Sequence, residues 1–161
     1  MPQISLHSPV GDLTLSEEDG AIVAIDWGWG RDQTATPLLL RARDQMEQYF
    51  DGTRLDFDLP LAPMGTDYQK RVWAALCAIP AGATCSYGDI ARIAGGSPRS
   101  VGGANGRNPI PIVIPCHRVL AGNGIGGYSA GDGPPTKRFL LDLEARATES
   151  LAPAPGQARL L

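Results

Sequence analysis

A cysteine and a histidine stand side by side at Cys116 and His117, directly after the apolar run Ile110–Ile114. A thiol with an imidazole nearby is a candidate activated nucleophile, because the thiolate is the reactive form and the imidazole can accept the thiol proton. Adjacent residues of a strand, however, point to opposite faces. A bridging water molecule or a turn is therefore needed before His117 can act on the Cys116 thiol.

A carboxylate that could orient this imidazole is Glu144, in a helix that we expect to run from Lys137 to about Ala147. Glu144 follows Leu140 by one turn and lies on the same apolar side. A carboxylate on that side needs a partner. Two alternatives are open: a half-exposed glutamate near a helix end, or a residue that orients His117 and completes a Cys–His–Glu relay.

Three further helices are predicted before the nucleophile. Thr66–Gln69 is a capping-box pattern that opens a helix ended by Pro80, and a second, short helix should cover Tyr87–Ala94. A glycine turn then leads to a third helix, which begins at Ser97 and must end before Asn108. Two short helices joined by a glycine turn, after another helix, indicate a helix-turn-helix.

The last of these helices has a face that is made mostly of glycine. Its members, which the helical spacing brings together, are Arg99, Gly102, Gly103 and Gly106. Each interior glycine costs a helix about 1 kcal/mol relative to alanine, so such a face should lie close to another molecule or element. Either a nucleic-acid backbone approaches it, with Arg99 projecting from the helix start, or a protein element packs against it.

The glycine face has almost no side chains with which to read bases. A helix-turn-helix usually sends polar side chains of its second helix into the major groove. This face suits a shallow approach to a minor groove instead, with Arg99 free to enter the duplex. The pattern is typical of a protein that scans DNA for something other than its sequence.

The first half of the chain contains no group that predicts chemistry. We expect three strands, a helix and an edge strand, at Ile4–Ser8, Asp12–Ser16, Ala21–Trp27, Pro37–Phe50 and Leu55–Leu59 respectively. Trp27 and Trp29 are expected to pack inside the protein rather than to bind a ligand.

Length and composition exclude several classes of protein. The 161 residues suffice for one domain or two small lobes. No apolar run reaches the roughly 18 residues of a membrane span, and the N-terminus lacks the pattern of a signal peptide, so a cytoplasmic protein is expected. Three cysteines without metal-like spacing indicate free thiols, with Cys77 and Cys85 inert in the core. Only His7 and His117 are available, so no zinc site is expected.

The net charge of −3 is distributed unevenly along the chain. Residues 1–65 carry 4 basic and 11 acidic side chains, whereas residues 66–161 carry 10 basic and 6 acidic ones. The acidic total argues weakly against a nucleic-acid partner, but the distribution matters more. The second half is the part that could bind a polyanion.

Together these motifs resemble the O6-alkylguanine-DNA alkyltransferases, also called methylated-DNA–protein-cysteine methyltransferases. The resemblance covers about residues 1–145, and the segment around Cys116 is its most specific part. The matching segments are Gln45–Gly52, Gly65–Gln69, Val72–Trp73, Ser86–Gly88, Arg99–Ala104, Asn108–Pro111, Ile114–Val119, Gly127–Ser129 and Lys137–Glu144.

The resemblance implies an α/β lobe followed by a mainly α lobe. The first, residues 1–62, would be ribonuclease-H-like, and the second, residues 63–147, winged-helix-like with the helix-turn-helix; residues 148–161 would form a flexible tail. The implied activity is DNA repair, in which the alkyl group of O6-alkylguanine, with O4-alkylthymine as an alternative, passes irreversibly to Cys116 in a single turnover. The implied partner is double-stranded DNA approached from its minor groove. The protein would be monomeric, with neither cofactor nor metal and no membrane.

The resemblance also implies a role for each matching residue. Cys116 would be the alkyl acceptor, His117 the water-bridged base that makes its thiolate, and Glu144 the residue that orients His117. Asn108 would brace the active-site turn. In the relatives, a tyrosine at the place of Tyr87 crowds the phosphate of the target nucleotide and contacts the flipped guanine.

Other matching positions would contact the DNA or the flipped base. Arg99 would fill the hole that this base leaves in the stack, with Gly102, Gly103 and Gly106 facing the DNA. The base pocket would contain Cys116, Val119, Tyr128 and Ser129, with Ser129 at the O6 side of the base.

The chain departs from the family pattern around the pocket. The stretch between Tyr87 and Arg99 is about two residues shorter than in many relatives, the segment Ala130–Pro135 is longer, and Gly106 replaces an arginine of some members. These changes bear on pocket shape and DNA affinity rather than on the chemistry. Two alternatives outside this family are a Cys–His hydrolase and a non-reactive protein that flags DNA lesions.

Overall fold

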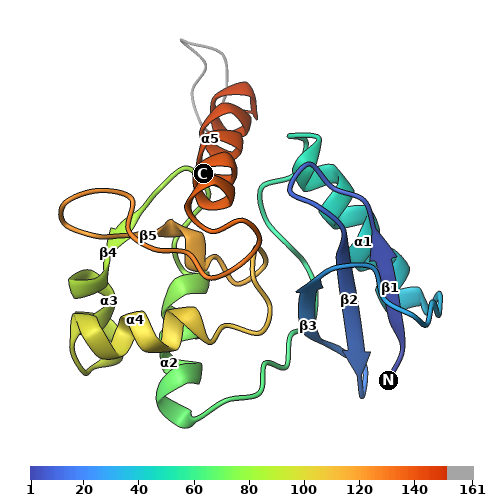
Figure 1. Ribbon diagram of the computed structural model, residues 1–161, viewed down its shortest axis with the longest axis horizontal. Helices are drawn as coiled ribbons and strands as arrows, with labels where there is room; N and C mark the ends of the chain where they lie inside the picture. The colour runs from blue at the N-terminus through green and yellow to red at the C-terminus, as the bar shows by residue number, and fades with distance from the viewer. Residues whose placement is uncertain (152–161) are drawn as a thin grey trace, which may run out of the picture.

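The computed structural model describes residues 1–151, which form two lobes on either side of a long helix (Figure 1). In the N-terminal lobe, the antiparallel sheet β1-β2-β3 comprises Gln3–Leu6, Leu13–Glu18 and Ala21–Trp27. The helix α1 (Pro37–Phe50) packs against β1 and β2. Its first turn is fixed by Thr36, whose hydroxyl accepts a hydrogen bond from the Leu39 amide at 3.1 Å.

The C-terminal lobe contains the predicted helix-turn-helix. Its helices are α2 (Asp67–Cys77), α3 (Tyr87–Ala94) and α4 (Pro98–Gly106). Each of them starts with a complete capping box, formed by the pairs Thr66 and Gln69, Ser86 and Asp89, and Ser97 and Ser100. The structure therefore confirms the three predicted helix starts.

The remaining elements lie around Cys116. The short strands β4 (Cys85–Ser86) and β5 (Val119–Leu120) pair in parallel, and the 3₁₀ turn η1 (Cys116–Arg118) directly precedes β5. The last helix, α5 (Pro134–Leu151), lies between the two lobes (Figure 1).

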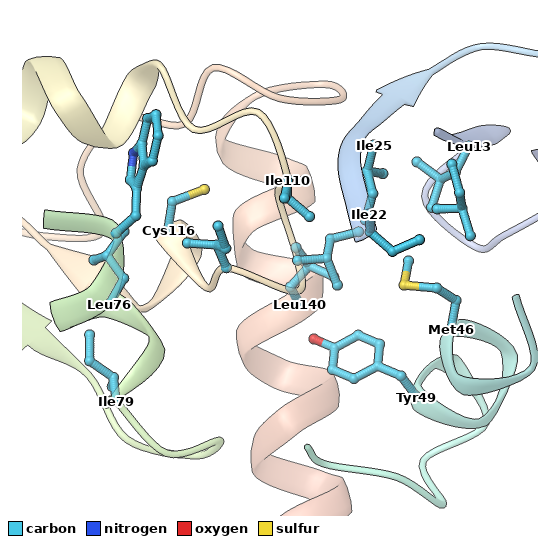
Figure 2. Close-up of a cluster of buried hydrophobic side chains, with 14 of the residues drawn as sticks. Leu13, Ile22, Ile25, Met46, Tyr49, Leu76, Ile79, Ile110, Cys116 and Leu140 are labelled. Atoms are coloured by element: carbon cyan, nitrogen blue, oxygen red, sulfur yellow. The ribbon is translucent and has the colours of Figure 1, made fainter. Parts of the chain in front are cut away.

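One hydrophobic core connects the lobes. Figure 2 shows Leu13, Ile22, Met46 and other N-terminal side chains on one side of α5, and side chains of the C-terminal lobe with Cys116 on the other. Leu140 of α5 is fully buried between them. Cys116 is thus part of the core that holds the two lobes together.

The predicted edge strand Leu55–Leu59 is wrong. The backbone of Asp58 bonds to a side chain instead: its amide donates to Gln45 Oε1 at 2.9 Å, and its carbonyl accepts from Gln45 Nε2 at 3.2 Å. The chain meets the sheet only afterwards, in a single bridge between Leu61 and Ile22. Backbone groups occupied by a side chain cannot also form a ladder.

Three side-chain or boundary predictions also need correction. Cys77 is exposed at the end of α2 and so lies outside the core, and Cys85 is only half-buried against it. Trp29 is 52% exposed and stacks on His7, whereas Trp27 packs against the core as predicted. The helix α5 continues to Leu151, so residues 148–151 do not belong to a tail; residues 152–161 lie outside the described part. Within residues 1–151, no helix is long and apolar enough to cross a membrane.

Candidate active site

The turn that carries Cys116 is held by the side chain of Asn108. Its amide nitrogen donates to the Ile114 carbonyl at 2.8 Å, and its oxygen accepts from the Ile110 amide at 2.9 Å. Between these points Ile112 has φ = 75°, a left-handed conformation that is rare for a β-branched residue. Asn108 thus braces a strained loop, which is the place that the sequence assigned to it.

Cys116 and His117 lie in the 3₁₀ turn η1 rather than in a strand. His117 is fully buried, and its Nε2 lies 2.6 Å from Glu144 Oε2. Because an ionised carboxylate can only accept, Nε2 carries the hydrogen, and Nδ1 of the neutral ring has a free lone pair. Nδ1 has no hydrogen-bond partner within residues 1–151. The ring is therefore oriented as a base.

Burial lowers the pKa of His117, although the hydrogen bond and charge of Glu144 oppose this effect. The imidazole is consequently neutral near pH 7, which is the form that accepts a proton. The prediction that Glu144 needs a partner on its apolar face is confirmed, because the carboxylate is 1% exposed and its partner is His117.

Two partners of Glu144 were missed by the sequence analysis. Arg118 Nε donates to Oε1 at 2.8 Å and Nη2 to Oε2 at 2.9 Å, while Nη1 donates to the Ile79 carbonyl at 2.6 Å. The Tyr49 hydroxyl donates to Oε2 at 2.6 Å. Burial alone would raise the pKa of Glu144, but the hydrogen bonds from His117 and Arg118 outweigh it and lower that pKa to about 2. Glu144 is thus permanently ionised.

The thiol itself is 5% exposed. Burial raises the pKa of Cys116, while interactions with Asn108 and Tyr128 and the charge of Lys137 act in the opposite direction. Since the net shift is upward, the resting group is a thiol. A base must therefore remove its proton when it reacts.

Lys137 is a further residue that the sequence analysis did not single out. Its Nζ is buried and donates to the carbonyls of Val119, at 2.6 Å, and Gly127, at 3.1 Å. Burial lowers the pKa of Lys137, and the negative charge of Cys116, when it is a thiolate, opposes this shift. The ammonium group thereby ties β5 to the loop that carries Tyr128 and adds positive charge near the thiol.

A pocket of about 320 Å³ opens onto Cys116. Its lining comprises Tyr87, Gly102, Asn105, Gly106, Cys116, Gly127, Tyr128 and Ser129. Tyr87, Tyr128 and Ser129 thus meet around the thiol, as the sequence analysis placed them. Val119 does not line this pocket: it is fully buried, because β5 turns its side chain into the core.

Asn105 was not foreseen as a pocket residue. Its amide nitrogen donates to the Cys116 carbonyl at 3.2 Å, and its buried Oδ1 has no partner within residues 1–151.

A second, larger depression of about 470 Å³ lies on the N-terminal lobe near His7 and Trp29. It contains no cysteine, whereas the smaller pocket contains Cys116.

The glycine face of α4 (Arg99, Gly102, Gly103 and Gly106) is open. Arg99, Gly103 and Gly106 are exposed, and a Cβ atom at Gly103 would meet no atom of residues 1–151 within 4 Å. The opposite side of α4 is buried, and Trp73 Nε1 anchors it by donating to the Ala104 carbonyl at 2.9 Å. A Cβ atom at Gly102 would contact the Tyr87 ring at 3.8 Å, and one at Gly106 would contact Ser129 Oγ at 3.9 Å, so these two glycines border the pocket. Within residues 1–151, no element packs on Gly103. The face remains free for an external partner.

Two family models match this chain. The model described as "6-O-methylguanine DNA methyltransferase, ribonuclease-like domain" matches residues 3–63, and the one described as "6-O-methylguanine DNA methyltransferase, DNA binding domain" matches residues 67–146. Together with the mixed α/β structure, they confirm the predicted fold class, an α/β ribonuclease-like lobe followed by a DNA-binding lobe.

Several curated proteins are similar over most of their length. The methylated-DNA–protein-cysteine methyltransferase of Methanosarcina barkeri is 42% identical over 151 residues, covering 86% of this chain and 94% of the relative. The constitutive protein of the same name from Bacillus subtilis is 43% identical over 153 residues, covering 86% and 92%.

Solved structures show the same similarity. The O6-methylguanine methyltransferase of Mycobacterium tuberculosis is 40% identical with a TM-score of 0.80, and 95% of each chain is covered. The Mycobacterium tuberculosis OGT in complex with DNA is 39% identical with a TM-score of 0.82, and 96% of each chain is covered.

Proposed function

Because this chain belongs to the methylated-DNA–protein-cysteine methyltransferase family, it repairs DNA by moving an alkyl group onto its own cysteine, and we propose that Cys116 is the acceptor. The observation that supports this assignment is the Cys116 thiol in a pocket, next to the oriented pair of His117 and Glu144. Neither Cys77, which is exposed, nor Cys85, which is half-buried, has a histidine beside it in the sequence.

The proposed substrate is O6-alkylguanine in double-stranded DNA. Inside a duplex the alkyl carbon is shielded, so the nucleotide must rotate out of the stack, which costs a few kcal/mol and less for a weakened pair. The pocket beside α4 would receive the base between Tyr87 and Tyr128, with Ser129 at its O6 side. O4-alkylthymine presents the same alkoxy group and is the second substrate to test.

The proposed chemistry is a single displacement at the alkyl carbon. His117 Nδ1 takes the Cys116 proton through a bridging water molecule, and the thiolate attacks the carbon as its bond to guanine O6 breaks. The leaving base needs a proton to become neutral guanine. Burial, and then the negative charge of a Cys116 thiolate, raises the pKa of Tyr87, so this phenol is a donor near pH 7.

The product explains why the protein acts only once. A thioether has no polarised carbonyl that water could attack, so no second step returns the thiol. The reaction forms one S–C bond and breaks one C–O bond, and it needs neither a redox agent nor a cofactor. Each monomer would repair one lesion.

The open glycine face supports an approach to the minor groove. Backbone can come close to backbone where α4 has no side chains, and the exposed Arg99 at its start can enter the space left by the flipped base. The exposure of this face, and the lack of side chains that could read base edges, favour binding without sequence readout.

Stoichiometric transfer from a duplex oligonucleotide with one O6-methylguanine tests the proposal. We expect a burst equal to the protein concentration, and mass spectrometry should find one added methyl group on the peptide that contains Cys116. The C116S variant should bind DNA without accepting the group, whereas C77S and C85S should still react. Continued turnover, or methylation at either of the other cysteines, would overturn the assignment.

The hydrolase alternative is tested in the same preparation. A Cys–His hydrolase should turn over an activated acyl ester repeatedly, because water can release a thioester. We expect no such turnover.

A further inference from the structure

Tyr49 connects the N-terminal lobe to the proposed active site. It lies in α1, 95 residues before Glu144 in the sequence, yet its hydroxyl donates to Glu144 Oε2 at 2.6 Å. Figure 2 shows the Tyr49 hydroxyl oxygen pointing toward α5, the helix that carries Glu144. Both side chains are 1% exposed, so water does not compete for this hydrogen bond.

We propose that Tyr49 is a positioning residue for alkyl transfer, which acts through Glu144 on the basicity and orientation of His117. This inference rests on the proposed relay of Cys116, His117 and Glu144. It adds that the relay is incomplete without a side chain of the ribonuclease-like lobe.

The hydrogen bonds of Glu144 support the positioning role. Oε2 accepts from Tyr49, His117 and Arg118, and Oε1 accepts from Arg118 as well. Each carboxylate oxygen offers about two lone-pair sites, so Oε2, which accepts three of these four hydrogen bonds, has no spare acceptor site. Together with Arg118, Tyr49 therefore fixes the oxygen that faces His117.

The same hydrogen bond affects the proton affinity of the His117–Glu144 pair. Burial, and then the charge of Glu144, raises the pKa of Tyr49, which keeps its hydroxyl protonated as a permanent donor. A donor on Oε2 withdraws negative charge from the side that stabilises an imidazolium. The Tyr49 hydroxyl thus helps to hold His117 in the neutral form that accepts the thiol proton.

Packing alone does not account for a tyrosine here. The ring of Tyr49 contacts Phe50 and Phe57, with centroid distances of 5.3 Å and 5.4 Å, and a phenylalanine would keep both contacts. The hydroxyl is the part that reaches Glu144. The variant Y49F therefore removes the hydroxyl that bonds to Glu144 and leaves the core filled.

The rate constant of single-turnover methyl transfer should be measured for Y49F between pH 5 and 9. We expect it to fall about 3- to 10-fold at neutral pH, the factor that corresponds to one lost buried hydrogen bond. The acidic limb of the profile should move to higher pH, because the His117–Glu144 pair binds its proton more tightly. DNA affinity should not change.

A second measurement does not depend on DNA. The chain has only two histidines, so NMR titration of the free protein, with His7→Gln to assign the signals, reports directly on His117. The pKa of His117 should be higher in Y49F than in the unaltered protein. This shift is a readout that a purely structural role of Tyr49 would not produce.

Thr14→Val provides a matched control. Thr14 is a buried residue of the same lobe whose hydroxyl donates to the Gly28 carbonyl at 2.7 Å, far from the relay in the sheet. T14V should lower the melting temperature about as much as Y49F does, without a change in rate or pH profile. If Y49F behaves like T14V, Tyr49 is only structural and the inference is overturned.

Glu144→Gln separates failure of this inference from failure of the proposed function. If E144Q slows transfer and Y49F leaves the pH profile unchanged, the relay holds and the role of Tyr49 is wrong. If E144Q transfers the methyl group at the unaltered rate, the relay itself is wrong, and the inference fails with it.

Discussion

The two sides of Cys116 differ in how their polar groups are satisfied. On the inner side, His117, Glu144, Arg118 and Tyr49 form a buried cluster in which the carboxylate accepts four hydrogen bonds. On the outer side, Arg99, Gly103 and Gly106 of α4 are exposed, and Gly102 is half-buried. In our proposal, the buried cluster is complete without DNA, whereas the glycine face gains its contacts only when DNA binds.

This difference predicts opposite costs of substitution. A buried charge that loses its partner is destabilising by several kcal/mol, because water cannot replace the partner. An exposed side chain away from such contacts usually changes stability by no more than about 0.5 kcal/mol. Substitutions in the buried cluster should therefore change both the stability of the protein and the rate of alkyl transfer. Substitutions on the glycine face should change only how the protein binds and processes DNA.

Arg118→Met should have the largest effect on stability. It removes the bidentate partner of Glu144 and leaves a buried carboxylate underpaired, so we expect a loss of about 3 to 5 kcal/mol in the free energy of unfolding. Urea denaturation measures this loss. The matched variant Arg99→Met makes the same change on the exposed face and should stay within about 0.5 kcal/mol of the unaltered protein. Equal effects of the two would contradict the comparison.

Acid should have the second-largest effect on the stability of the buried cluster. The pKa of Glu144 is about 2 in the folded protein and about 4.3 in an unfolded chain, so the folded state favours its ionised form. The resulting stability is present above about pH 4.3 and is lost as pH falls toward 2; it is on the order of 3 kcal/mol.

Urea denaturation at pH 6 and pH 3 checks this expectation. The unaltered protein should lose more stability between the two values than E144Q does, because glutamine does not titrate. A loss of the same size in E144Q would assign the acid sensitivity to other carboxylates.

Arg99→Ala should impair DNA processing without a change in stability. If Arg99 fills the space left by the flipped base, its loss should slow transfer from duplex DNA about tenfold, since flipping becomes more costly. Transfer from a single-stranded oligonucleotide needs no flipping and should change less. Arg43→Ala removes a positive charge from α1 in the other lobe and serves as the control for net charge. If R99A slowed transfer equally from duplex and single-stranded DNA, Arg99 would have no role in base flipping.

The sequence predicted the helices of the outer side well, because capping residues close to each helix start determine where it begins. The capping boxes at Thr66, Ser86 and Ser97 set the starts of α2, α3 and α4 within one residue. It also predicted which residues share the glycine face, which needs only the helical spacing of Arg99 and its glycines, but it left open whether that face is exposed or packed against a protein element. Such features depend on residues that are close together in the chain.

The buried side was predicted only in part, because its contacts join distant residues. Cys116, His117 and Glu144 could be found from reactive side-chain types, but Tyr49 donates to Glu144 from 95 residues away. No periodicity shows such a pairing. Arg118 carried a signal, since an arginine between a histidine and an apolar strand has to find a carboxylate. The failed edge strand at Leu55–Leu59 has the same cause, a competing bond from Gln45.

Gly103→Ala should have the smallest effect on the free protein and should change its stability in the favourable direction. A methyl group at this position meets no atom of residues 1–151 within 4 Å, and alanine favours a helix by about 1 kcal/mol over glycine. We therefore expect the free energy of unfolding to rise by up to about 1 kcal/mol. The affinity for duplex DNA should fall, because the methyl group stands where the backbone of DNA would approach.

Gly88→Ala is the matched control for this substitution, because it adds the same methyl group to α3. There the nearest atom would be Ser86 Oγ at 3.7 Å, an ordinary contact. G88A should gain helix stability and retain DNA affinity. If G103A also retains its affinity, DNA does not come close to α4, and the glycines of the open face need another explanation.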